Sequence, residues 1–199
     1  MKPDRLNAFT DGVIAIIITI MVLEIRVPAA GNLEAVKPVL PILGAYALSF
    51  VNVGIFWSNH HHMLQSVRRV NGAVLWANLF LLFSLSLVPF VIRWMDEAGF
   101  ASLPVAAYGF VLGMSAVGYL WLQHEIIRMN GGPDSRLAHA LGNDWKGRLS
   151  LISYFIAAPL AFVQPLIAVA VYVIVAGVWL VPDRRIEHRL PAKPADRAG

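Results

Sequence analysis

The sequence predicts an all-α membrane protein, and three observations support that prediction. Of the 199 residues, 58% are apolar and only 14% are charged, whereas soluble domains are about 45–50% apolar and about 25% charged. Four long stretches contain no Asp, Glu, Lys or Arg, and a helix needs about 20 apolar residues to cross a bilayer. The net charge of +4 is then better explained by basic cytoplasmic loops than by a nucleic-acid partner.

The first helix is predicted over residues 6–27, although only 12 uncharged residues lie between Asp11 and Glu24. Such a stretch makes roughly 18 Å of helix. It could also be the core of a signal peptide, but Asp11 stands where that core would begin, and Glu24 and Arg26 follow it. Charges at the edge of a membrane helix usually face protein or water. We therefore expect this helix to lie centrally rather than at the lipid edge.

The remaining spans follow the uncharged stretches in order: residues 38–67, 70–92, 98–123 and 149–182. The last stretch has 34 residues and would extend roughly 51 Å as a single helix. Gln164-Pro165 near its middle is the expected turn between two helices, and Pro159 is a second candidate break. The sequence thus predicts one domain of six spans over residues 1–182. A basic tail over residues 183–199, which we expect to be disordered, follows it.

The basic residues predict the orientation of these spans. With six spans and a cytoplasmic N-terminus, 13 of the 16 Lys and Arg residues fall in cytoplasmic segments. Only Arg26, Lys37 and Arg93 fall outside. If residues 149–182 crossed once, each side would hold eight. The positive-inside rule therefore favours six spans with both termini in the cytoplasm.

Motifs for enzyme chemistry are absent from the sequence. There is no G-x-S-x-G, HExxH, P-loop or G-x-G-x-x-G pattern, and the chain has no cysteine. We therefore expect no enzyme activity, no cofactor and no metal site. His60, His61 and His62 are consecutive, and consecutive helical side chains point about 100° apart, so they cannot converge on one metal ion. Gly109 and Gly113 form a GxxxG pattern, which is typical of close helix packing.

One face of the first helix is a candidate pore lining. Ile16, Thr19, Ile20 and Leu23 follow the i, i+3, i+4, i+7 spacing of a single helix face. A stripe of this kind alone is more often lipid-facing or part of a core. Symmetric rings of such side chains can form an apolar constriction that gates by dewetting. Ionisable groups are scarce at membrane depth, which weakens the case for a proton-coupled transporter. The polar residues that remain there are Thr19, Asn52, Asn78, Ser84 and Ser86.

The start of the first helix carries a family resemblance. The segment Arg5-Leu-Asn-Ala-Phe-Thr-Asp11 resembles the R-x-x-x-F-S-D motif of the transmembrane protein 175 family, the lysosomal potassium channels of animals and their bacterial relatives. Thr10 stands where the motif has Ser, and it keeps the hydroxyl. In the second helix, Trp57-Ser-Asn-His60 is similar to the W-x-x-H of the family.

The resemblance implies a homotetramer of six-helix chains around a central pore that the first helix lines. Large aliphatic side chains then form the constriction in place of a carbonyl filter. By position, Ile16, Ile20 and Leu23 would form that constriction, and Thr19 would form a polar ring beside it. The sequence contains no TVGYG-type loop, in agreement with this design. A polar network would tie the first helix to the second through the motif residues Arg5, Phe9, Thr10, Asp11, Trp57 and His60.

These observations together predict a potassium-permeable cation channel of a prokaryotic inner membrane. Its expected partners are further copies of itself, membrane lipid and monovalent cations, with potassium as the permeant ion and no nucleic acid. Two alternatives stay open. One is a proton-conducting channel or proton-coupled carrier, in which His60 and Asp11 form a relay. The other is a non-conducting membrane scaffold.

Overall fold

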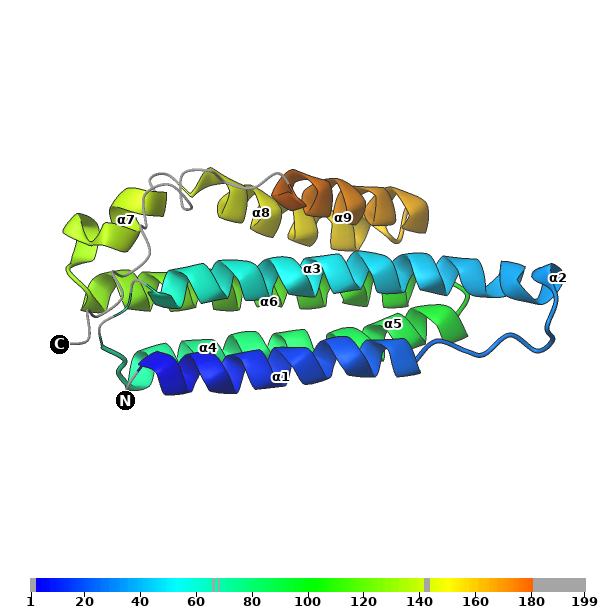
Figure 1. The fold of residues 1–199 in the computed structure, drawn as a ribbon. Coiled ribbons are helices and arrows are strands. Elements are labelled where there is room, and N and C mark those ends of the chain that lie inside the picture. The colour runs from blue at the N-terminus through cyan, green and yellow to red at the C-terminus, as the bar shows by residue number, and fades with distance from the viewer. Residues whose placement is uncertain (1–2, 66, 68, 142–143, 181–199) are drawn as a thin grey trace.

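The computed structural model describes residues 3–180, apart from residues 66, 68, 142 and 143. Every regular element in this part of the chain is helical, as predicted. The long helices lie along one bundle axis, and successive helices run in alternating directions (Figure 1). The predicted disordered tail over residues 183–199 lies outside the described residues.

Among the described residues, four helical segments are long and apolar enough to cross a membrane, and each overlaps one of the first four predicted spans. They are α1 (Pro3–Leu23), then α2 (Leu33–Val36) with η1 (Lys37–Val39) and α3 (Leu40–Gln65), then α4 (Gly72–Ser86) with α5 (Val88–Glu97), and α6 (Ser102–Met129). The other elements are η2 (Gly132–Asp134), α7 (Arg136–Leu141), α8 (Trp145–Leu160) and α9 (Pro165–Leu180).

The long uncharged stretch after residue 148 is divided as predicted. α8 ends at Leu160 and α9 begins at Pro165, so the break lies next to Gln164. Pro159 lies inside the last turn of α8 and does not end that helix. The two helices pack against each other. Each has 16 residues, about 24 Å of helix, which is less than the hydrocarbon core of a bilayer at about 30 Å.

Two departures from the prediction have a local cause in the structure. α1 ends at Leu23 rather than at residue 27, because Glu24 and Arg26 leave the helix and pair with side chains of α5. The third span is interrupted at Leu87. Pro89 has no N–H, so it cannot donate a helical hydrogen bond. The Leu87 N–H donates to the carbonyl three residues back, that of Ser84, at 3.2 Å.

The central helix of the single chain is α6, not α1. α6 packs against α4, α5, α8 and α9, whereas α1 contacts α3, α4 and α5. Of the most apolar stretch of each helix, 67% is buried in α6 and only 28% in α1. The prediction of a central first helix is therefore wrong for the single chain, in which α1 lies at one edge of the bundle (Figure 1). Two of the charges that suggested a central position, Glu24 and Arg26, pair with side chains of α5.

Glycines let the neighbours of α6 approach closely. A Cβ at Gly109 would overlap the hydroxyl of Tyr172 on α9, and a Cβ at Gly113 would meet the ring of Phe155 on α8 at 3.1 Å. A Cβ at Gly118 would lie 2.9 Å from the backbone of α4. The GxxxG pattern is therefore confirmed as a packing feature that seats the α8–α9 hairpin on α6.

Candidate pore face and its supporting network

α1 has one buried face and one open face. The side chains buried against α3, α4 and α5 are Leu6, Thr10, Ile14, Ile17 and Met21. On the other side, Ile16, Ile20 and Leu23 are 58%, 40% and 78% exposed, and Thr19 is exposed beside them. The four predicted residues thus share one surface, and the described part of the chain leaves that surface largely open.

The Thr19 hydroxyl is oriented by its own helix. Its Oγ1 donates to the backbone carbonyls of Ala15, at 3.0 Å, and Ile16, at 2.9 Å. A hydroxyl has one hydrogen and two acceptor lone pairs. Because this hydrogen is directed to the backbone, the lone pairs of the oxygen are available to a hydrogen-bond donor or a cation on the open side of the helix.

A buried polar cluster lies behind this face and joins three helices. Thr10 on α1, His60 on α3 and Asn78 on α4 are each fully buried. The Asn78 amide nitrogen donates to Thr10 Oγ1 at 3.0 Å, and Asn78 Oδ1 lies 2.8 Å from His60 Nε2. An amide oxygen only accepts, so His60 Nε2 must carry the hydrogen of this bond. Hydrogen bonds of this kind in an apolar core fix the alignment of the helices. The other ring nitrogen of His60, Nδ1, is buried without a hydrogen-bond partner among the described residues.

A second connection joins α1 to α3 at the bundle surface. The Trp57 indole donates to Asp11 Oδ1 at 2.8 Å, and the Asn7 amide donates to Asp11 Oδ2 at 3.0 Å. Both carboxylate oxygens are therefore engaged. The structure thus brings together four of the six predicted network residues, through two separate sets of contacts.

The other two predicted network residues, Arg5 and Phe9, do not join these contacts. Both are exposed, Phe9 by 52%. Arg5 and Phe9 lie one turn apart, on the same side of the helix as Gly12 and Ile16. They therefore extend the open face toward the N-terminal end of α1. Arg5 and Asp11 do not pair in the hydrogen bonds and ion pairs of the described residues, where Trp57 and Asn7 contact the Asp11 carboxylate.

Ion pairs anchor the other end of α1 to α5. Glu24 lies 3.3 Å from Arg93, which also contacts Glu97 at 2.9 Å. Arg26 lies 3.0 Å from Asp96. The charges that end α1 are thus compensated by protein, as the sequence suggested, although it did not indicate α5 as the partner.

The three consecutive histidines have different surroundings. His60 is buried in the cluster with Asn78. The His61 ring lies 5.8 Å from the Trp57 ring, and the His62 ring is edge-on to His61 at 6.0 Å. Their directions diverge, as expected for consecutive residues of one helix.

The helical fold and the open aliphatic face of α1 define a multi-pass membrane protein. Residues 5–89 match the family model described as endosomal/lysosomal potassium channel TMEM175. The chain is 48% identical over 190 residues to a protein named potassium channel from a Chryseobacterium species, covering 96% of this chain and 98% of that one. It is also 30% identical over 182 residues to a potassium channel of Streptomyces collinus, covering 86% of this chain and 88% of that one.

A solved structure agrees with these relatives. The crystal structure of a lysosomal potassium-selective channel TMEM175 homolog from Chamaesiphon minutus matches with a TM-score of 0.73 and 26% identity, over 92% of this chain and 97% of that one. The chain therefore belongs to the TMEM175 family, a family of ion channels and not of enzymes. This confirms the family that the motif of the first helix indicated.

Proposed function

We propose that the chain forms a potassium-permeable cation channel in a prokaryotic inner membrane, with four copies around a central pore. Its membership of the TMEM175 family and its similarity to proteins named potassium channels support potassium as the permeant ion. The observation that carries the pore assignment is the open face of α1. Ile16, Thr19, Ile20 and Leu23 gather there on the outside of a single chain.

An ion pathway along this face needs more than one chain. α1 lies at the edge of the bundle, so its open face cannot enclose an ion by itself. Rotational symmetry would bring the same face of every copy to a shared axis, as in other closed rings of identical subunits. Four copies, the number that the family resemblance implies, would place Ile16, Ile20 and Leu23 in successive rings.

These aliphatic rings would act as both gate and filter. A narrow apolar constriction excludes water, so a passing ion must lose part of its hydration shell. Potassium holds its water less tightly than sodium and therefore pays a smaller penalty. The Thr19 oxygen, whose hydrogen is engaged by the backbone, would stabilise the partly dehydrated ion beside the barrier. Preference of this origin is modest, because the ring side chains are mobile.

The proposed topology has six crossings with both termini in the cytoplasm. The distribution of Lys and Arg supports it, since 13 of 16 would lie inside. The alternating directions of α1, α3, α4–α5, α6, α8 and α9 are compatible with it (Figure 1). In this arrangement the Glu24–Arg93 pair would lie at the outer mouth, close to the Leu23 ring.

Single-channel recording of the purified protein in a planar bilayer tests the function directly. We expect unitary currents whose reversal potential shifts from zero toward the potassium equilibrium potential under a potassium/sodium gradient. Saturating flux that requires a proton gradient would instead indicate a carrier, and currents that follow the proton gradient would indicate a proton channel. Silence of folded, reconstituted protein would favour a scaffold.

A further inference from the structure

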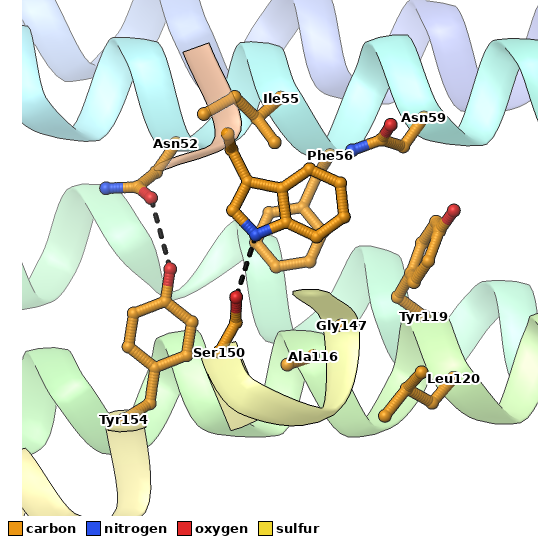
Figure 2. Close-up of a pocket in the computed structure, with 11 residues that line it drawn as sticks. Asn52, Ile55, Phe56, Asn59, Ala116, Tyr119, Leu120, Gly147, Ser150 and Tyr154 are labelled. Carbon is orange, nitrogen blue, oxygen red and sulfur yellow. Dashed lines mark hydrogen bonds between the residues drawn. The ribbon is translucent and has the colours of Figure 1, made fainter. Parts of the chain in front are cut away.

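A narrow pocket lies between α3, α6 and α8, and no residue of α1 lines it (Figure 2). Its lining extends from Asn52 to Asn59 on α3 and from Gly147 to Tyr154 on α8, which is about 10 Å along each helix. The free volume inside is about 30 Å³. The pocket is therefore long and thin, a shape that suits an unbranched chain better than a ring or a bulky group.

The polar side chains at one end of the pocket are already hydrogen-bonded (Figure 2). Tyr154 donates its hydroxyl to Asn52 Oδ1 at 3.3 Å, and the Trp179 indole donates to Ser150 Oγ at 2.7 Å. Ser150 in turn donates to the backbone carbonyl of Lys146 at 2.8 Å. Mainly rings and methylene groups are left facing the pocket. This end therefore suits an apolar chain.

The other end presents two polar groups. Asn59 and Tyr119 both line the pocket, and neither side chain forms a hydrogen bond with another residue in the described ranges. Tyr119 is only 7% exposed, and its hydroxyl points to the side on which Asn59 lies (Figure 2). A phenol and an amide suit a neutral acceptor such as an ester carbonyl. The negative charge of Asp144 near Tyr119 disfavours an anion at this point.

A positive charge borders the same pocket. The Lys146 ammonium lies 5.9 Å from the centroid of the Trp179 ring, and Trp179 is part of the pocket wall. The adjacent Trp145 is 49% exposed. Exposed Trp beside a basic residue is typical of the level at which lipid head groups begin. An apolar groove, a neutral polar pair and a cation therefore all border one pocket.

We infer that this pocket binds a glycerophospholipid. One acyl chain occupies the groove, its ester carbonyl accepts from Tyr119 and Asn59, and its phosphate lies by Lys146. The groove separates α3 from α8, so the bound chain acts as a spacer between the α8–α9 hairpin and the rest of the bundle. The site is distinct from the proposed pore. Its test measures binding without current, so it can fail or succeed independently of ion conduction.

Native mass spectrometry of the delipidated full-length protein tests this inference. Phosphatidylglycerol of defined chain length is added, and diacylglycerol with the same chains serves as the probe without phosphate. We expect one tightly retained phosphatidylglycerol per chain and at least tenfold weaker binding of diacylglycerol. Ala116→Phe fills the groove and should abolish retention. Ala170→Phe, at an exposed position of α9, should leave it unchanged.

Two variants that add no volume test the polar contacts and remain informative if Ala116→Phe does not fold. Tyr119→Phe should weaken binding about three- to tenfold, the effect of one hydrogen bond, whereas Tyr108→Phe on the same helix should not. Lys146→Gln should weaken binding of phosphatidylglycerol more than Arg148→Gln does, because the Lys146 ammonium lies over Trp179 of the pocket wall. Equal binding of diacylglycerol, equal effects of the two charge variants, or full retention by folded Ala116→Phe would overturn the inference.

Discussion

The side chains on the open face of α1 have two different proposed roles in the pore. Ile16, Ile20 and Leu23 have no polar atom and can only exclude water. Thr19 has the one side-chain oxygen among them, and its hydrogen bonds to Ala15 and Ile16 hold that oxygen in a defined position. Conductance should therefore respond to the aliphatic positions, whereas ion preference should respond both to these positions and to Thr19.

The first prediction concerns the aliphatic ring. Ile20→Asn or Leu23→Asn should hydrate the constriction, raise single-channel conductance severalfold and reduce the preference for potassium over sodium, because the dehydration barrier falls. Thr19→Val keeps the shape and should reduce the preference while the pore still opens. Reversal potentials under potassium/sodium gradients measure the ion ratio.

The matched control for this prediction is Ile152→Asn. Ile152 is 55% exposed and lies on α8, far along the chain from α1, so the same chemical change there should leave conductance and ion ratio as in the wild type. If Asn at all three ring positions has no effect in well-folded oligomers, the ions follow another path.

The second prediction concerns Asp11, whose two oxygens accept from Trp57 and Asn7. Asp11→Ala should lower the free energy of unfolding by about 1–2 kcal/mol, the contribution of hydrogen bonds to a partly exposed charged group. Asp4→Ala, at an exposed position of the same helix, should change it little. Thermal unfolding in detergent compares the two, and equal midpoints would make Asp11 an ordinary surface residue.

At this scale the sequence identifies residues better than it identifies their partners. The spacing of Ile16, Thr19, Ile20 and Leu23 correctly predicts their common face, since that depends only on helix geometry. It could not predict that Asn78 joins Thr10 to His60, because that contact spans 68 positions of the chain. An amide inside an apolar stretch signals only that some partner must exist.

At the scale of elements, the proline and glycine positions decide how the helices break and pack. Pro165 begins α9 and Pro89 accompanies the interruption before α5. The first break is predictable because the uncharged stretch is too long for one helix. The uncharged stretch over residues 70–92 has the ordinary length of one span, so only the structure reveals the interruption before α5. Helix boundaries that depend on tertiary ion pairs, such as the end of α1, leave no local signal either.

The third prediction uses two glycines with opposite environments. Gly109→Ala should lower the free energy of unfolding by about 1–3 kcal/mol, because the added methyl group overlaps Tyr172. Gly177→Ala meets no atom within 4 Å and should raise it by about 0.5–1 kcal/mol through helix propensity. Thermal midpoints in detergent measure both, and a stabilising Gly109→Ala would contradict the close packing of α6 with α9.

At the scale of the whole molecule, composition predicts the class of protein and the structure supplies the arrangement. The apolar stretches predict a membrane bundle without any contact information. They cannot tell which helix is central, because α1 and α6 are both apolar and the difference lies in the glycines that face the α8–α9 hairpin. The place of α1 at the bundle edge supports the proposal that the pore lies on an axis shared by several copies.

The final prediction decides whether the α8–α9 hairpin crosses the membrane. Each helix, at 16 residues, is shorter than a typical span, so a hairpin that enters and returns without crossing is the physical alternative. The charge distribution favours two full crossings.

With two full crossings, a cysteine at Gln164, exposed in the turn between the helices, should react with an impermeant thiol reagent added outside intact cells. Cysteine at Ala101 should also react from outside, and cysteine at Asp134 should react only after the membrane is opened. The chain has no cysteine of its own, so each signal belongs to the introduced residue. Labelling of Ala101→Cys without labelling of Gln164→Cys would show that the hairpin does not reach the outer surface. The chain would then have four crossings and a re-entrant hairpin, with the same cytoplasmic tail.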